Sequence, residues 1–146
     1  MNYLIDTNVL SELAKDKPDP QATAWFSEHI NDKLLISVIT VGEIAYGIEK
    51  MEAGKKRAEL KDWFESMLLE WFDDSIVPIN EDVMFAWARL RATSRTLPIL
   101  DSLIAASVLS THAVLATRNI RDFEGIEGLE TVNPWDDASG AQPASN

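Results

Sequence analysis

Short apolar runs alternate along this chain with apolar residues at helical spacing. The first run, at residues 3–5, predicts a buried strand, and Val9, Leu10 and Leu13 then repeat at the spacing of one helix face. Later runs predict four more short strands, at LLIS (34–37), SIVPIN (75–80), AVLAT (113–117) and ETVNPW (130–135).

Helical patterns fill the segments between these strands. We expect them at residues 21–30, 40–51, 54–72, 100–112 and in a segment that begins at Asn80 or Glu81. Strands that alternate with helices predict a parallel sheet covered on both faces. The expected fold is therefore a single α/β domain over residues 1–135, with a small parallel sheet flanked by helices. The two middle helices, about 39–72, are expected to project as an arm, and residues 136–146 to form a flexible tail.

The composition of the chain excludes several kinds of site and several classes of protein. The 146 residues include no cysteine, which excludes disulfides and thiol-ligated metals. No apolar stretch approaches the roughly 20 residues of a membrane span, and the brief apolar start is not a signal-peptide core, so we expect a cytoplasmic protein. A net charge of −11 argues against a long nucleic-acid groove and leaves local basic clusters as the regions that could contact phosphates.

Four acids occupy positions that solubility does not explain. Asp6 ends the first strand, and Glu43 lies beside an inward-facing position of the helix after the second strand. Asp101 stands among the most apolar residues of the chain, and Asp122 follows the AVLAT strand. Because the segments after parallel strands gather at one edge of the sheet, these carboxylates are expected to converge there.

Each acid also has a purely structural interpretation. Asp6 and Asp101 are reasonable helix caps, Asp122 a turn residue and Glu43 a solvated helix residue. As a group, however, four carboxylates in one cleft repel one another unless cations neutralise them. Oxygen ligands without His or Cys favour Mg²⁺ or Mn²⁺, and such a site is suited to phosphodiester hydrolysis.

Four segments resemble one known family. YLIDTNVLSEL, VGEIAYGIEK, LDSLIAAS and LATRNIRDFEGI are similar, in order and spacing, to motifs of the PIN-domain ribonucleases. The closest likeness is to the VapC-type toxins of bacterial toxin–antitoxin pairs, in particular their FitB-like branch. The resemblance covers about residues 2–134 and implies a small parallel sheet between helices, usually in a homodimer.

The resemblance also assigns roles to residues. It implies an acidic core of Asp6, Glu43 and Asp101, with Asp122 as the fourth member, and site support from Thr7 and Asn119. The implied activity is Mg²⁺- or Mn²⁺-dependent endonucleolytic cleavage of RNA, inhibited by a cognate antitoxin.

We further hypothesise a division of labour among the four acids. Asp6 and Asp101 bind the principal metal directly, while Glu43 and Asp122 act through waters or hold a second ion. No His lies near these motifs, so the metal is expected to activate the attacking water. Arg118 and Arg121 flank the site in sequence and are candidates to hold RNA phosphates.

Two other enzyme classes fit the sequence less well. A haloacid-dehalogenase-type phosphatase needs a second Asp two residues after the nucleophile, where this chain has Asn8. A receiver domain needs a late Lys, and no Lys follows Lys61. The remaining alternative is a PIN-like module that has lost its activity and acts only within a protein complex.

The helical pattern at residues 54–72 bears on partners. Its apolar stripe is broader than one core contact requires. Either the helix is buried on both sides within the monomer, or Trp63, Met67 and Trp71 line a groove for an apolar helix of the antitoxin or for a second subunit.

Overall fold

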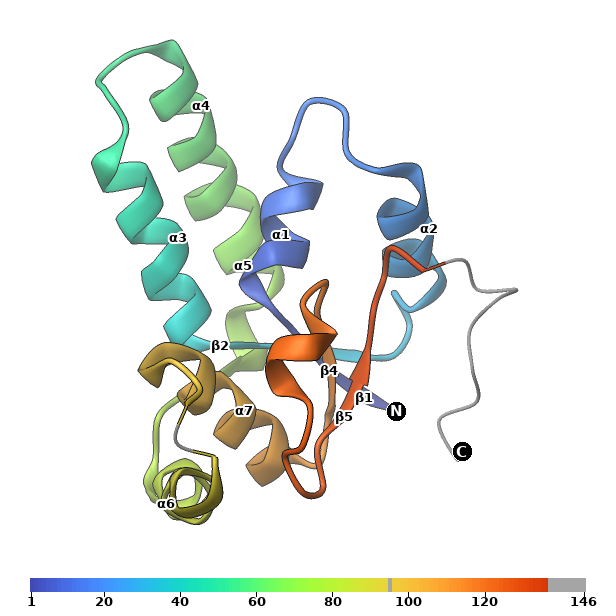
Figure 1. Ribbon diagram of the computed structural model, residues 1–146. Coiled ribbons are helices and arrows are strands. Elements are labelled where there is room, and N and C mark those ends of the chain that lie inside the picture. Colours follow the sequence, from blue (N-terminus) through green and yellow to red (C-terminus); the bar gives the residue numbers. More distant parts are fainter. Residues whose placement is uncertain (95, 137–146) are drawn as a thin grey trace.

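A five-stranded parallel sheet organises the molecule (Figure 1). The computed structural model describes residues 1–94 and 96–136. The strand order is β3-β2-β1-β4-β5, and every neighbouring pair is parallel. The strands are β1 (Asn2–Ile5), β2 (Lys33–Ser37), β3 (Ile76–Val77), β4 (Val114–Ala116) and β5 (Glu130–Val132). The predicted parallel sheet is confirmed.

Helices connect the strands as the sequence pattern predicted. They are α1 (Thr7–Leu13), α2 (Pro20–Glu28), α3 (Val38–Lys50), α4 (Lys55–Trp63), α5 (Leu69–Trp71), α6 (Glu81–Thr93) and α7 (Ile99–Thr111). A π-helical turn, η1 (Phe64–Leu68), joins α4 to α5, and two 3₁₀ turns follow at η2 (Asp73–Ser75) and η3 (Ile120–Phe123). No helix within the described residues is long and apolar enough to cross a membrane.

The strands divide their side chains between two hydrophobic cores. Ile5 and Ile36 point into one core, where they meet α1, α2, α3 and the η1 turn. Leu4 and Leu35, their neighbours along the strands, point into the other core with α7. Because consecutive strand residues face opposite sides, this alternation buries both faces of the sheet between helical layers.

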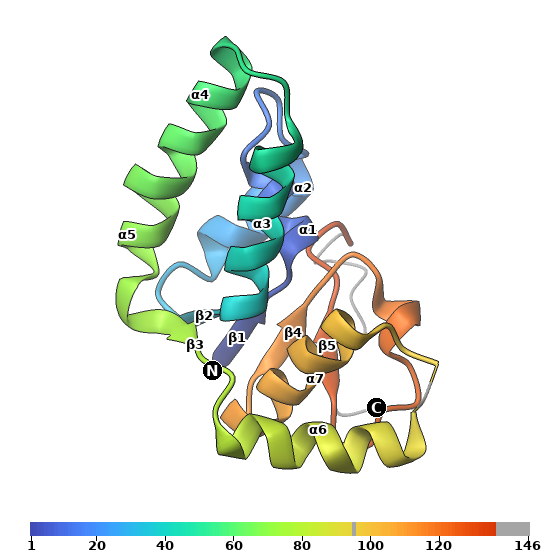
Figure 2. The same cartoon turned by 90° about the vertical axis from the view of Figure 1, so that its left-hand side faces the viewer.

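The two middle helices form the predicted arm. Helix α3 and the segment from α4 to α5 lie side by side and extend away from the sheet in both views (Figures 1 and 2). Gly54, at φ 159°, precedes α4 in the turn between them. At the base of the arm, Phe64, Leu68 and Phe72 are buried in the first core, which fixes the arm to the sheet.

Two predicted strands are shorter than their patterns indicated. SIVPIN pairs only through Ile76 and Val77, because Pro78 has no N–H with which to continue the ladder. ETVNPW pairs only to Val132, because Asn133 then accepts the backbone N–H of Trp135 at 2.9 Å and turns the chain. The predicted tail, apart from Asp136, lies outside the described residues.

Candidate active site

The first and fourth strands end beside one another at the carboxyl edge of the sheet. After β1 the chain first builds β2 and β3 on one side, and later β4 and β5 on the other. The point between β1 and β4 is thus the place where the topology reverses, and such points favour ligand sites in open α/β sheets. Asp6 and Thr117 are the residues that immediately follow these two strands.

Asp6 is both a helix cap and a buried site residue. Its Oδ1 accepts the backbone N–H of Thr7 at 2.8 Å, at the start of α1. Its Oδ2 accepts the hydroxyl of Thr117 at 2.7 Å, and only 6% of the residue is exposed. Asp6 therefore caps α1 through Oδ1, as one interpretation of the sequence expected, and this cap does not exclude a site role for the same carboxylate.

Asn8 and Thr117 complete the surroundings of Asp6. The Asn8 amide nitrogen donates to Asp6 Oδ2 at 3.3 Å and to Thr117 Oγ1 at 3.2 Å. The Asn8 Oδ1 accepts the backbone N–H of Arg118 at 3.2 Å, while Thr117 Oγ1 accepts the backbone N–H of Asn119 at 3.1 Å. The Asp6 carboxylate is thus held in one orientation by donors from both strand ends.

Glu43 reaches the same region from α3. The Thr7 hydroxyl donates to Glu43 Oε1 at 2.6 Å and shares a second hydrogen bond, of 3.0 Å, with the Thr40 hydroxyl. Thr40 is fully buried, one helical turn before Glu43. The hydroxyl contact expected of Thr7 is therefore present, and its partner is Glu43.

Asp101 brings a third carboxylate, from the first turn of α7. It lines one cavity of about 460 Å³ together with Asp6 and Glu43. We call this space the acidic cavity, and its wall consists of Asp6, Thr7, Asn8, Ser11, Glu12, Lys15, Glu43, Asp101, Arg118, Asn119 and Trp135.

The carboxylates perturb one another. Burial raises the pKa of Asp6 above its usual range, against hydrogen bonds from Thr117 and Thr7 that lower it, and the charges of Glu43 and Asp122 raise it further. Burial likewise raises the pKa of Asp101, with the charges of Asp6 and Asp122 adding to the effect. Negative charge is therefore concentrated at this edge of the sheet.

Asp122 contributes to this concentration of negative charge from outside the acidic cavity. It is exposed in η3 and lines a separate hollow with Thr93 and Glu124. Its charge nevertheless reaches both Asp6 and Asp101, as their raised pKa values reflect. The structure thus brings Asp6, Glu43 and Asp101 into one cavity and leaves Asp122 at its margin.

The donor set suits a hydrated divalent cation. Across residues 1–94 and 96–136, no ion pair involves Asp6, Glu43 or Asp101. In the same ranges no three acids or histidines are already grouped closely enough to enclose an ion. Mg²⁺ keeps several waters and is commonly bound through only one or two carboxylates, so carboxylates spread around a cavity fit it.

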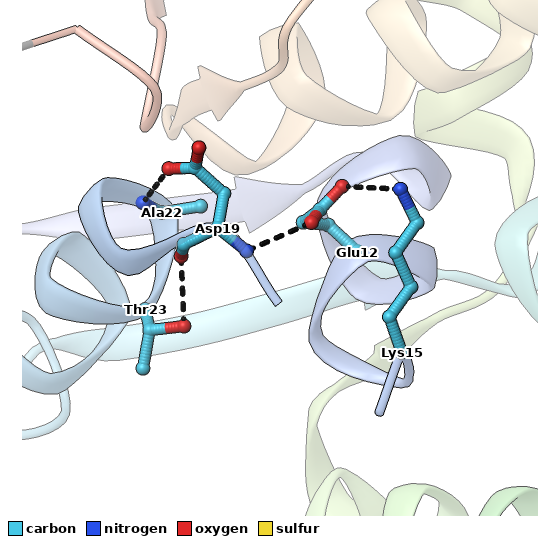
Figure 3. A network of polar contacts seen from close by, with 5 residues as sticks. All are labelled: Glu12, Lys15, Asp19, Ala22 and Thr23. Carbon is cyan, nitrogen blue, oxygen red and sulfur yellow. Dashed lines mark hydrogen bonds and ion pairs between the residues drawn. The ribbon is translucent and has the colours of Figure 1, made fainter. Parts of the chain in front are cut away.

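Two cations line the acidic cavity. Lys15 forms a 2.8 Å ion pair with the buried Glu12, whose other oxygen accepts the backbone N–H of Asp19 at 2.8 Å (Figure 3). These donors hold the pKa of Glu12 below its usual range. Arg118 lies over the ring of Trp135. Arg121, the other basic candidate, is exposed and does not line this cavity.

The predicted partner residues differ in their exposure to solvent. Met67 and Trp71 are 62% and 51% exposed, so the helix is not buried on both sides. Trp63 is half-buried and lines a different hollow, of about 550 Å³, with Lys56 and Leu60. Trp71 contacts Phe26, with ring centroids 5.7 Å apart.

Sequence reasoning did not identify several residues of this site. The sequence analysis assigned no site role to Asn8, Glu12, Thr40, Thr117 or Trp135, although the first two lie within YLIDTNVLSEL and Thr117 lies within LATRNIRDFEGI. Of these residues, Thr117 is the one that the sequence could have indicated, because it directly follows a strand, as Asp6 does. Asn119 was predicted to act through its amide, whereas its recorded contact is the backbone N–H to Thr117.

Comparison with known proteins identifies similar chains. The family model for the PIN domain matches residues 3–129. VapC ribonuclease Y4jK of Sinorhizobium fredii is 34% identical over 139 residues, which span 92% of this chain and 99% of that protein. Toxin FitB of Neisseria gonorrhoeae is 31% identical over 138 residues, which span 92% of this chain and 99% of that one.

Solved structures show the same likeness. The crystal structure of FitAcB from Neisseria gonorrhoeae contains a chain with a TM-score of 0.84 and 31% identity, covering 91% of this chain and 98% of that one. Toxin–antitoxin complexes are among the other structures of similar fold. The resemblance and the fold expected from the four motifs are confirmed.

Proposed function

This chain belongs to the PIN-domain family, and on that premise we propose that it is a metal-dependent endoribonuclease, the toxin of a toxin–antitoxin pair. One observation carries the proposal: Asp6, Glu43 and Asp101 come from three separate elements to line a single cavity. The ribonuclease name of the relative Y4jK and the toxin name of FitB give the reaction and its biological setting.

Asp6 and Asp101 are the proposed direct ligands of Mg²⁺ or Mn²⁺. Both carboxylates have pKa values raised by burial and by neighbouring negative charge, which a cation would relieve. Glu43 and Asp122 are assigned to contacts through water or to a second ion. When bound, the ion supplies Lewis-acid activation of water and neutralises charge on the phosphodiester.

The chain's own residues orient these groups. Thr117 and Asn8 fix the plane of the Asp6 carboxylate, so that Oδ2 is held by side-chain donors and Oδ1 by the start of α1. Thr7 fixes one oxygen of Glu43 through its 2.6 Å hydrogen bond. Asn119 is assigned a supporting role at the cavity wall, through its backbone contact to Thr117.

Basic residues are assigned to the RNA phosphates. Arg118 lines the acidic cavity, and its exposed guanidinium is able to reach a phosphate at the cavity mouth. Arg121 is exposed on the adjacent turn η3 and would contact the RNA at a phosphate farther from the carboxylates. Such contacts fix the position of RNA without reading its sequence.

A cognate antitoxin is the proposed regulator. Met67 and Trp71 offer exposed apolar surface on the arm, and Trp63 lines the hollow nearer α1. A basic side chain of the antitoxin inserted among the carboxylates would compete with the metal ion. We also propose that the protein is a homodimer and that it acts in the cytoplasm. Adding the antitoxin should change Trp fluorescence and stop cleavage, and an unchanged spectrum would contradict contact at the arm.

The Asp6→Asn variant tests the nuclease. Purified protein should cleave RNA with Mg²⁺ or Mn²⁺, and the variant should lose that cleavage because one charge and one ligand oxygen are removed. Asp74→Asn is the matched control, since Asp74 is exposed in η2 and outside the acidic cavity. Cleavage by Asp6→Asn at the parental rate would overturn the assignment, and cleavage unaffected by a chelator would overturn the role of the metal.

A further inference from the structure

Trp135 forms part of the wall of the acidic cavity. The ring is half-buried and packs against the core beneath β1 and β4. The guanidinium carbon of Arg118 lies 4.9 Å from the ring centroid, within the range of a cation–π contact. Trp135 is therefore anchored against the first core and also belongs to the wall of the space that contains the carboxylates.

Hydrogen bonds fix both residues at the cavity wall. Asn133 Oδ1 accepts the backbone N–H of Trp135 at 2.9 Å, and its amide nitrogen donates to the carbonyl of Arg118 at 3.5 Å. The backbone N–H of Arg118 donates to Asn8 Oδ1 at 3.2 Å. The peptide groups on both sides of Arg118 are thus held, while its exposed side chain keeps freedom to move.

The negative net charge of the protein favours RNA contacts that do not depend on charge. The chain carries a net charge of −11, and only Lys15 and Arg118 are cations in the described wall of the cavity, with Lys15 already paired to Glu12. Phosphate contacts alone give limited attraction in such a field. Stacking of a base on an aromatic ring does not depend on net charge. A base stack is also stronger than an exposed cation–π contact, so a base can displace the guanidinium from the indole.

Resting on the proposed ribonuclease function, we infer that Trp135 is a positioning residue on which an unpaired RNA base stacks beside the phosphodiester to be cleaved. Arg118 leaves the indole when the base arrives and turns to a phosphate. The bases of a duplex already stack on their neighbours, so this platform selects single-stranded segments of RNA.

Binding by variants in the Asp6→Asn background tests the inference without cleavage. The probes are a synthetic single-stranded RNA of mixed sequence and the same RNA annealed to its complement. Trp135→Leu should weaken single-strand binding roughly 5- to 140-fold, the equivalent of one base stack, and leave duplex binding unchanged. Trp135→Phe should keep most of the affinity. The control is Phe85→Leu, because Phe85 is exposed on α6 outside the cavity.

Fluorescence supplies a measurement that does not depend on the fold of the leucine variant. Single-stranded RNA should quench the emission of Trp135, so the quench should be present with the natural tryptophan and absent in Trp135→Phe. Equal quenching in the two proteins would overturn the inference, as would leucine-variant binding equal to the control or an equal loss for both probes. If the parental protein cleaves RNA but any of these contradicting results is found, only the stacking role fails. If the parental protein cleaves no RNA with Mg²⁺ or Mn²⁺, the proposed function fails and the inference with it.

Discussion

Replacing Thr117 with valine isolates a single hydrogen bond at the centre of the site. The two side chains have nearly the same shape, and Thr117 is fully buried at the end of β4. The substitution removes the hydroxyl that donates to Asp6 Oδ2 at 2.7 Å. It also removes the oxygen that accepts hydrogen bonds from the Asn8 amide and from the backbone N–H of Asn119. Because Asn119 is exposed, water can replace the contact that its N–H loses.

The expected loss of stability follows from the charge on Asp6. A hydrogen bond to a charged group contributes about 1.5–3 kcal/mol. For a domain of this size, 1 kcal/mol corresponds to roughly 3 °C in Tm, so the Tm of Thr117→Val should fall by roughly 5–9 °C. The measurement is thermal unfolding in the presence of a chelator. Thr93→Val is the matched control, because its exposed hydroxyl donates to the carbonyl of Leu90 and its loss should change little.

The pH dependence provides the sharper test. Burial has already raised the folded-state pKa of Asp6 above its unfolded value, so ionisation of Asp6 costs stability as the pH rises through that range. Without the Thr117 hydroxyl the pKa rises further, and ionisation costs more. The difference between parental and variant proteins should therefore be largest near pH 7 and should shrink as the pH falls toward about 4. A loss that is equal at every pH, or no larger than that of Thr93→Val, would refute this account.

Three other predictions concern the carboxylates. Asp101→Asn should raise the metal-free Tm slightly, because the charge it removes is disfavoured by burial and by Asp6 and Asp122, and solvent screening at this half-buried position keeps the rise small, while RNA cleavage is lost; a lower Tm would contradict this. Mg²⁺ at about one hundred times its Kd should stabilise the parental protein by about 2.7 kcal/mol, seen as a rise in Tm that Asp6→Asn lacks; an equal rise in both would show that Asp6 is not a ligand. Thr7→Val should slow single-turnover cleavage roughly 10- to 100-fold by releasing Glu43, with an unchanged fold, and a parental rate would exclude that role.

Periodicity predicted most of the fold because burial imposes it. Every helix that the pattern indicated is present, and the sheet is parallel, because the apolar strands need helices on both faces. The exceptions have local causes. Pro78 ends β3 after two residues, and the Asn133 turn ends β5 at Val132, so side-chain and backbone hydrogen bonding overrode the apolar pattern at both places.

The site was predictable only in part. The sequence indicated Asp6 because it ends a strand, Glu43 because it lies beside an inward-facing helix position, and Asp101 because its neighbours are strongly apolar. Thr117 and Asn8 follow no such irregularity, since a buried hydroxyl or amide beside a strand end looks like any turn residue. Tryptophan is a residue type that is common in hydrophobic cores, so the sequence does not distinguish Trp135 from a core residue. The turn at Asn133 places it at the cavity.

The hydrogen bond between Asp6 and Thr117 joins residues separated by 111 positions. A growing polypeptide therefore carries Asp6 out of the ribosome long before β4 exists to complete the centre. Residues 1–116 alone cannot assemble the donor that fixes Asp6, and Trp135 emerges later still. A nascent chain that still lacks Thr117 therefore cannot hold the Asp6 carboxylate in the orientation that it has in the folded site.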